Sequence, residues 1–94
     1  MTILDLEKIL NDKKEFRIFY RNNQDTLSAN LNEFKIRIID SKFYYLELRE
    51  ENFLFSISLE KEELTKKLDI LDKANLRVFY LNLKNCQITV YLDK

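Results

Sequence analysis

The chain has 94 residues, 46% of them hydrophobic and 13% aromatic, which is enough apolar content to build a core and excludes a disordered chain. Its 16 basic and 16 acidic residues leave no net charge, which argues against a general nucleic-acid coat or a polybasic membrane anchor. It contains no glycine, proline or histidine and one cysteine, so it has no glycine-rich phosphate loop, no histidine base and no Cys/His metal cluster.

The first segment is predicted to be a helix over residues 3–12, ending in the polar run 11–14. Thr2 precedes it and Asp5 follows three residues later, which is typical of a capping box. The apolar residues behind Thr2 recur at helical spacing, namely Ile3, Leu6 and Leu10.

Three features of the sequence indicate the cellular compartment. Asp5 and Glu7 interrupt the apolar start, so we expect no signal peptide. The longest apolar runs, such as 78–81, have four residues, so no segment is expected to span a bilayer. Cys86 has no partner for an internal disulfide, which favours a reducing cytoplasm.

The middle of the chain alternates apolar and polar residues, which predicts an antiparallel meander. Polar runs at 22–25, 40–42 and 50–52 are predicted turns, and residues 27–32 are ambiguous between a short edge strand and a loop. The predicted strands cover 16–21, 34–39, 43–49 and 53–59.

Helical periodicity returns over about 59–74, where acidic residues come first and lysines later, an order that suits the helix dipole. Its leucines, Leu64, Leu68 and Leu71, are interpreted as core residues in preference to a dimer seam, because two heptads are too few for a coiled coil. Asn75 is predicted to cap this helix in a left-handed conformation. Two strands near 76–83 and 86–92 then form a closing hairpin.

The element order is therefore α-β-β-β-β-α-β-β in a single domain, 1–94. We expect an α+β fold: a two-layer sandwich with an antiparallel sheet of about five to six strands and two helices on one face.

One group of residues suggests a binding surface. All arginines fall in predicted strands, each on the side opposite the cleaner apolar set, and aromatic residues share that side. We expect a partner-binding sheet face that contains Arg17, Phe19, Arg21, Lys35, Arg37, Tyr45, Arg49, Arg77 and Phe79. Arginine and aromatic side chains are enriched at the centres of protein interfaces. The alternative is an ordinary solvated sheet face, in which Glu47 pairs with an arginine across strands.

Other polar patterns are weaker. Asp25, Glu33 and Lys35 follow the D…ExK order of metal-dependent nucleases, and Asp40, Glu47 and Arg49 are a poorer version, but such patterns arise by chance in a chain that is 34% charged. The acidic cluster Glu60, Glu62 and Glu63 is interpreted as the first turn of a helix. Cys86 is interpreted as a structural thiol, because no histidine is present to activate it.

We therefore expect a non-enzymatic protein-binding module without a cofactor or metal. The size, and a composition rich in Lys, Asn, Ile, Phe and Tyr that indicates a low-GC genome, resemble the small proteins of phages and mobile elements, among them anti-CRISPR inhibitors of host defence complexes. That resemblance is one of class and implies steric blocking of a larger host protein or nucleoprotein complex. The alternatives are a single-stranded nucleic-acid binder that uses the same face, and a homodimer.

Overall fold

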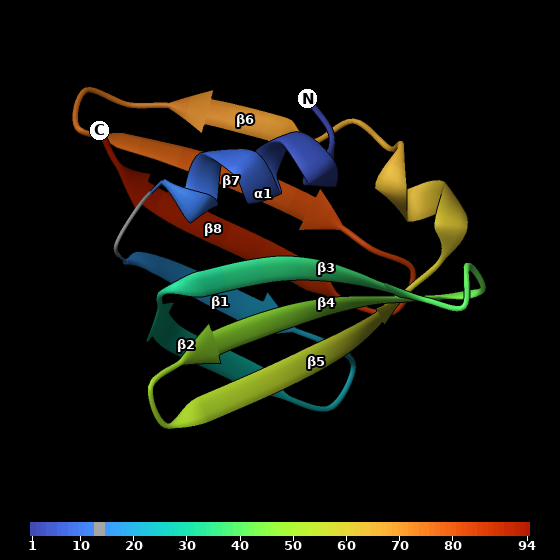
Figure 1. The fold of residues 1–94 in the computed structure, drawn as a ribbon. Helices are drawn as coiled ribbons and strands as arrows, with labels where there is room; N and C mark the ends of the chain where they lie inside the picture. The colour runs from blue at the N-terminus through green and yellow to red at the C-terminus, as the bar shows by residue number, and fades with distance from the viewer. Residues whose placement is uncertain (13–14) are drawn as a thin grey trace.

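Two antiparallel sheets and one α-helix make up the fold, which is that of a small α+β domain (Figure 1). The computed structural model describes residues 1–12 and 15–94. The helix is α1 (Ile3–Asn11). The five-stranded sheet has the order β2-β1-β8-β7-β6 and the three-stranded sheet the order β3-β4-β5. The strands are β1 (Phe16–Arg21), β2 (Thr26–Leu31), β3 (Glu33–Ile39), β4 (Phe43–Glu50), β5 (Phe53–Leu59), β6 (Asp69–Asp72), β7 (Leu76–Asn82) and β8 (Gln87–Asp93).

The two sheets pack face to face, with α1 beside the three-stranded sheet and in front of β7 and β8 (Figure 1). Asn32 alone separates β2 from β3, so the chain passes from one sheet to the other within one residue. Aromatic pairs join the sheets: the ring centroids of Phe16 and Phe34 are 6.3 Å apart, and those of Tyr20 and Phe55 are 4.9 Å apart. The core lies between the layers, and its largest fully buried side chains are Phe34, Phe79, Ile3, Leu6, Leu10, Ile18, Leu31, Leu46, Leu48, Leu81, Ile88 and Val90.

The predicted first helix is confirmed as α1 over Ile3–Asn11. Asp5 Oδ2 accepts a hydrogen bond of 2.9 Å from the backbone N–H of Thr2, and this bond lowers the pKa of the Asp5 carboxyl. On the inner side of the helix Ile3, Leu6 and Leu10 are buried, as their spacing predicted. Residues 13 and 14 of the predicted polar helix end lie outside the described residues.

The predicted strands of the meander are also present, and the ambiguous segment 27–32 forms most of edge strand β2. The predicted turn at 40–42 contains the two positive φ angles found among the described non-glycine residues, 53° at Asp40 and 56° at Ser41. Asp and Ser therefore take the left-handed conformation that glycine would supply in most chains. The turn at 22–25 instead uses the side chain of Asn22, whose Oδ1 accepts hydrogen bonds from the backbone N–H groups of Gln24 and Asp25.

The predicted helix over 59–74 is wrong. Only one turn of 3-10 helix, η1 (Lys61–Leu64), forms there, and strand β6 follows it. Thr65 Oγ1 donates a hydrogen bond to the Glu62 carbonyl, which closes the turn, and the N–H of Leu68 donates to the Met1 carbonyl. Residues 69–72 then pair with β7. Tertiary pairing with the free edge of β7 overrides the local helical preference. Asn75, the predicted left-handed cap, has no positive φ.

The predicted single sheet with two helices on one face is therefore corrected to two sheets and one α-helix. The physical reason is that the second layer, which two helices were expected to supply, comes mainly from the β3-β4-β5 meander folding over the five-stranded sheet. In the described part of the chain no helix is both long enough and apolar enough to cross a membrane.

We predict that Phe34→Ala destabilises the fold by about 3–5 kcal/mol, because it leaves a cavity where a fully buried ring joins the two sheets. Urea denaturation followed by circular dichroism measures this free energy of unfolding. Phe43→Ala, at the exposed end of the same hairpin (56% exposed), is the matched control and should cost less than about 1 kcal/mol. Equal losses for the two variants would contradict the assigned core.

Candidate functional site

The residues predicted to share one sheet face lie on three different sides of the two sheets. Arg17, Phe19 and Arg21 lie on the outer face of the five-stranded sheet. Lys35, Arg37, Tyr45 and Arg49 lie on the outer face of the three-stranded sheet. Arg77 and Phe79 lie on the inner side of the five-stranded sheet. Because the two sheets pack face to face, their outer faces point in opposite directions, and the expected single surface does not exist.

Phe79 and Arg77 were assigned to the wrong side of β7. Phe79 is paired with the buried Val90 and is itself fully buried in the core. Arg77 lies on the same side, at the end of the strand, where its Nε donates to Asp72 Oδ1 at 2.6 Å. This hydrogen bond lowers the pKa of the Asp72 carboxyl. The error arose because β7 has apolar residues on both faces, so alternation within the strand does not show which side is buried.

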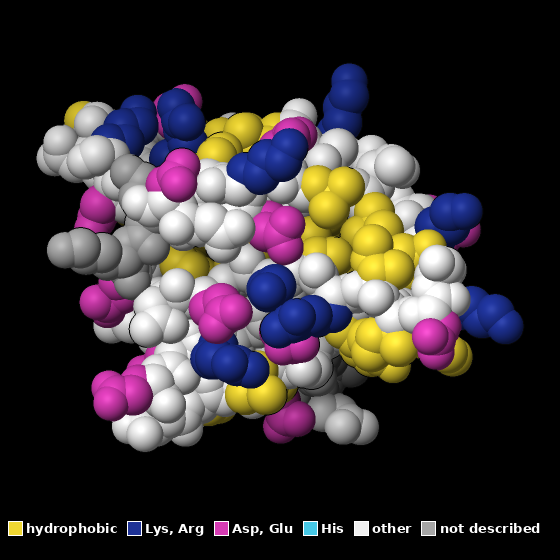
Figure 2. Space-filling view, in the orientation of Figure 1, with side chains coloured by type: hydrophobic (Ala, Val, Ile, Leu, Met, Phe, Trp, Pro, Cys, Tyr) yellow, Lys and Arg dark blue, Asp and Glu magenta, His cyan; other side chains and the backbone are white. Residues whose placement is uncertain are grey.

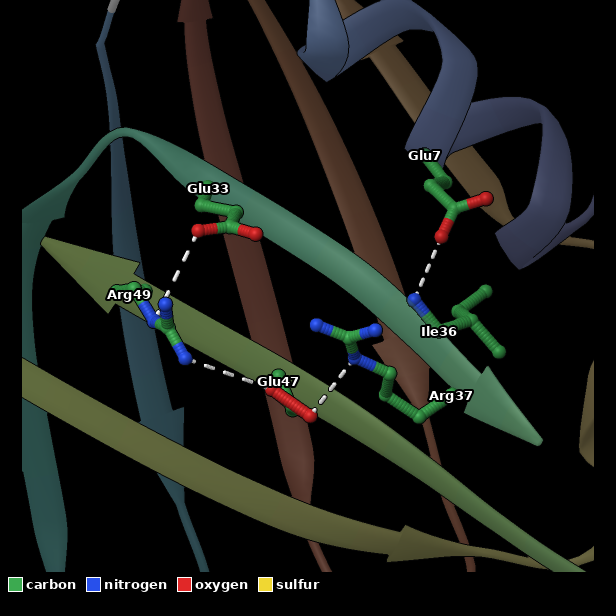
Figure 3. A network of polar contacts seen from close by, with 6 residues as sticks. All are labelled: Glu7, Glu33, Ile36, Arg37, Glu47 and Arg49. Atoms are coloured by element: carbon green, nitrogen blue, oxygen red, sulfur yellow. Dashed lines mark hydrogen bonds and ion pairs between the residues drawn. The ribbon is translucent and has the colours of Figure 1, made fainter. Parts of the chain in front are cut away.

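On the outer face of the three-stranded sheet the arginines are paired with carboxylates (Figure 3). Arg37 Nε lies 3.0 Å from Glu47 Oε1, and Arg49 lies 3.8 Å from Glu33 and 3.9 Å from Glu47. Figure 2 shows this side of the molecule, where basic and acidic side chains are intermixed. The alternative interpretation from sequence, a solvated face with a cross-strand Glu47 pair, therefore describes this surface.

The outer face of the five-stranded sheet differs in its charges. The Arg17 guanidinium carbon lies 4.9 Å from the centroid of the Tyr91 ring, a cation–π contact. Arg21 Nη2 donates to Gln87 Oε1 at 2.8 Å. Among the described residues, no carboxylate lies within 4 Å of either guanidinium. Both cations are thus available to an external carboxylate or phosphate.

Apolar side chains surround these two arginines. Phe19 is 39% exposed, Tyr80 is 38% exposed and Leu71 is 43% exposed. Val78 lies between Leu71 and Tyr91 in the sheet register and is buried, although it does not belong to the hydrophobic cluster between the sheets. We call this surface the Arg17 face and define it by Arg17, Phe19, Arg21, Leu71, Val78, Tyr80, Thr89 and Tyr91.

Each end of the Arg17 face has a surface hollow. The hollow beside Arg17 is lined by Glu15, Asn30, Tyr91 and Asp93, among others. The hollow beside Arg21 is lined by polar residues of the β1–β2 and β7–β8 turns, including Asn22, Asn23, Lys84 and Asn85. Charged and amide side chains therefore flank an apolar centre, which is the arrangement found at protein interfaces.

Leu71 and Tyr80 belong to the Arg17 face but not to the predicted set of binding residues. The prediction that Leu71 is a core residue of a helix is wrong, since it is an exposed residue of strand β6. The predicted face of β7 put Tyr80 on the core side, whereas it is exposed. The signal for Tyr80 was the pairing of the closing hairpin, in which Asn82 lies opposite Gln87 and Tyr80 opposite Thr89. Two polar pairs at alternate positions mark the solvent side of a hairpin, whereas the residue pattern of β7 alone does not show which of its sides faces solvent.

The other predicted polar sites are not assembled. Asp25 lies in the β1–β2 turn, away from Glu33 and Lys35 on the other sheet, and Asp40 lies at the hairpin end beyond Glu47 and Arg49. Over residues 1–12 and 15–94, no three Asp, Glu or Cys side chains gather as metal ligands. Within the acidic cluster, Glu63 is buried and its Oε1 accepts a hydrogen bond of 2.8 Å from the backbone N–H of Lys84. Glu63 therefore ties η1 to the β7–β8 hairpin.

Cys86 is a buried free thiol, as predicted. Burial raises its pKa to about 11, and the negative charge of Glu63 adds to the effect. The thiol is therefore protonated at neutral pH and is a packing residue of the β7–β8 hairpin.

Comparison of this chain with protein-family models, with curated proteins and with solved structures found no match in any of the three.

We predict that Cys86 reacts slowly with Ellman's reagent in the folded protein, because only the thiolate attacks and its pKa is about 11. Between pH 8 and 10 the rate should rise about tenfold per pH unit, since that range lies below the pKa. The urea-unfolded chain is the control, and its single thiol should react about 100-fold faster at pH 8. A folded-state rate that is constant between pH 8 and 10 would exclude the raised pKa.

Proposed function

We propose that this protein is a binding module that acts by occupying a surface of a larger protein through the Arg17 face. The observation that supports this proposal is the contrast between the two outer faces. Arg37 and Arg49 are paired with carboxylates of their own sheet, whereas Arg17 and Arg21 have none within 4 Å among the described residues. Free cations beside exposed aromatic rings are the ingredients of an interface centre.

The chemistry of the Arg17 face defines the chemistry of its partner. Phe19, Leu71 and Tyr80 offer apolar area that a partner removes from water. Arg17 and Arg21 lie one on each side of Phe19 along β1, so a matching surface has an apolar patch flanked by carboxylates. Tyr91 supports Arg17 from the neighbouring strand and reduces the conformational freedom that its guanidinium loses on binding.

The same proposal includes a mode of action. A small domain that covers a functional surface of a cytoplasmic host complex blocks it without catalysis, as the phage and mobile-element inhibitors that this chain resembles in class do. Three features of the chain support this mode: its size, its lack of histidine and its neutral total charge. The proposal needs no cofactor and no metal.

Single-stranded nucleic acid is the second candidate partner for this face. Phe19 and Tyr80 lie two strands apart on the same sheet row, across Thr89, which places their rings about 10 Å from each other. Exposed aromatic rings beside arginines form a platform on which bases stack. Asp69, opposite Tyr80 on β6, opposes phosphate binding there, and this favours the protein partner.

The test is an affinity capture from nuclease-treated lysate of a low-GC bacterium, using wild-type protein and the double variant Arg17→Glu/Arg21→Glu. The matched control is Lys35→Glu/Lys42→Glu, which makes the same change of charge at two exposed lysines, one on β3 and one in the β3–β4 turn. We predict that wild type and control retain one protein in stoichiometric amount, and that the Arg17/Arg21 variant binds it about 100-fold more weakly or more.

Two outcomes contradict the assignment. Equal capture by all three proteins would exclude the Arg17 face as the binding surface. Binding of a fluorescent single-stranded oligonucleotide by the wild type, weakening steeply with salt and lost in the Arg17/Arg21 variant, would assign the face to nucleic acid instead.

A further inference from the structure

The four edges of the two sheets differ in how they are protected against further strand pairing. Edge strand β6 has four residues with an Asp at each end. Edge strand β3 lies against α1, and the carboxylate of Glu7 on α1 accepts a hydrogen bond from the N–H of Ile36. Short length, charge and a covering helix are the usual means of protecting a sheet edge. Edge strands β2 and β5 have none of these.

Strand β5 is the more apolar of the two unprotected edges. Its seven residues, Phe53–Leu59, include no charge in a chain that is 34% charged. Leu54 is 54% exposed, and the half-buried rings of Phe53 and Phe55 stack with centroids 6.3 Å apart at the margin of the core. In Figure 1, β5 forms the free lower edge of the front sheet, and β4 is the strand that pairs with it.

The register shows which backbone groups of β5 are free. The N–H of Ile36 points to Glu7 and therefore away from β4, so Ile36 and Leu46 form a non-hydrogen-bonded pair. Hydrogen bonding alternates along an antiparallel strand, so Leu46 bonds to its β5 partner Ile57. The backbone groups of Ser56, next to Ile57, then point outward, and those of Leu54 and Ser58 do the same.

We propose that β5 pairs antiparallel with β5 of a second copy of this chain, about a two-fold axis at Ser56. A two-fold axis through a hydrogen-bonded pair requires a central residue whose N–H and C=O both point outward, and Ser56 meets this condition. The two three-stranded sheets then form one continuous sheet across the dimer.

Around this axis the side chains match. Phe55 lies opposite Ile57 of the second copy, and Phe53 lies opposite Leu59, so the apolar inner sides of the two strands face the same way. Leu54 lies opposite Ser58 on the outer side. No strand residue brings a like charge to the axis, whereas a symmetric pair through a charged edge places equal charges together.

A two-fold antiparallel pairing through β2 brings together fewer apolar side chains than the pairing through β5. An axis at Ser28 pairs Leu27 with Ala29 of the second copy, and the only further apolar residue, Leu31, meets Asp25. Less apolar surface is buried there, so the second copy is assigned to β5. The dimer leaves the Arg17 face open, because β5 belongs to the other sheet. The proposed dimer therefore does not depend on the proposed function.

Disulfide trapping tests the register. In a Cys86→Ser background, Ser56→Cys places two thiols opposite each other across the axis, at a Cα separation of about 5.5 Å, which a disulfide spans. The matched control is Ser58→Cys, whose two copies are four residue positions apart, about 14 Å, and beyond the reach of a disulfide. We predict covalent dimer for Ser56→Cys under mild oxidation and monomer for Ser58→Cys. Equal yields from the two positions would overturn the register.

Sedimentation equilibrium tests the dimer without any cysteine substitution. The average mass of the wild-type protein should rise from 11.5 kDa towards twice that value with concentration. Ser56→Lys places two like charges at the axis and should remain monomeric, whereas Ser28→Lys, the same change at the exposed edge of β2, should dimerise as the wild type does. The proposal would be overturned if the wild type stayed monomeric up to about 1 mM, a concentration at which even a millimolar dissociation constant gives dimer. A dimer that persists in Ser56→Lys would also overturn it.

Discussion

The rest of the structure depends on the one-residue corner at Asn32. Strands β2 and β3 are consecutive in the chain but belong to different sheets, and Asn32 is the only residue between them. Its backbone N–H donates a hydrogen bond of 3.0 Å to the Arg49 carbonyl, so the corner is held by β4 and the chain cannot continue straight. The meander that follows is therefore turned over the inner face of the five-stranded sheet. The meander closes the core together with α1, the one α-helix of the described chain, whose Ile3, Leu6 and Leu10 are buried.

That closure explains why the two outer faces differ. On the outer face of the three-stranded sheet the arginines lie beside acids, and Glu47 lies within 4 Å of both Arg37 and Arg49. Such exposed pairs contribute little to stability, but they leave few charges for a partner. On the five-stranded sheet Asp72 is paired with Arg77 and Lys94 at the edge, and no described carboxylate lies within 4 Å of Arg17 or Arg21. Arg17 and Arg21, which form no ion pair with the described residues, lie beside exposed aromatic rings.

An interface on one face and a dimer edge on the other sheet are compatible, because a two-fold pairing through β5 leaves both Arg17 faces accessible. A dimer would present the face twice, which raises avidity towards a repetitive or dimeric target.

Single side-chain carboxylates tie η1 to the β7–β8 hairpin and α1 to the edge of β3. Glu63 is a buried carboxylate that bonds to the backbone of the β7–β8 hairpin, and Glu7 covers the β3 edge. In a chain without glycine or proline, side-chain carboxylates and the left-handed Asp40–Ser41 turn take over the shaping of turns and edges.

The α+β class, the first helix and the strands of the meander could be predicted from the residue pattern, because helical and two-residue periodicity record which side of a local element is buried. The sequence also indicated the buried thiol of Cys86 and the cross-strand pairing of Glu47. The fate of residues 69–72, the buried side of β7 and the division of the arginines between two sheets depend on contacts between distant segments. Residues 69–72 belong to a segment with helical spacing, yet they pair as an extended strand with the free edge of β7, a partner that no local pattern reveals. Phe79 and Tyr80 are adjacent and both aromatic, and only the pairing of β7 with β8 decides that one is buried and the other exposed. The expected single arginine face was divided at the corner at Asn32, because β3, β4 and β5 form a second sheet whose outer face points away from that of the five-stranded sheet.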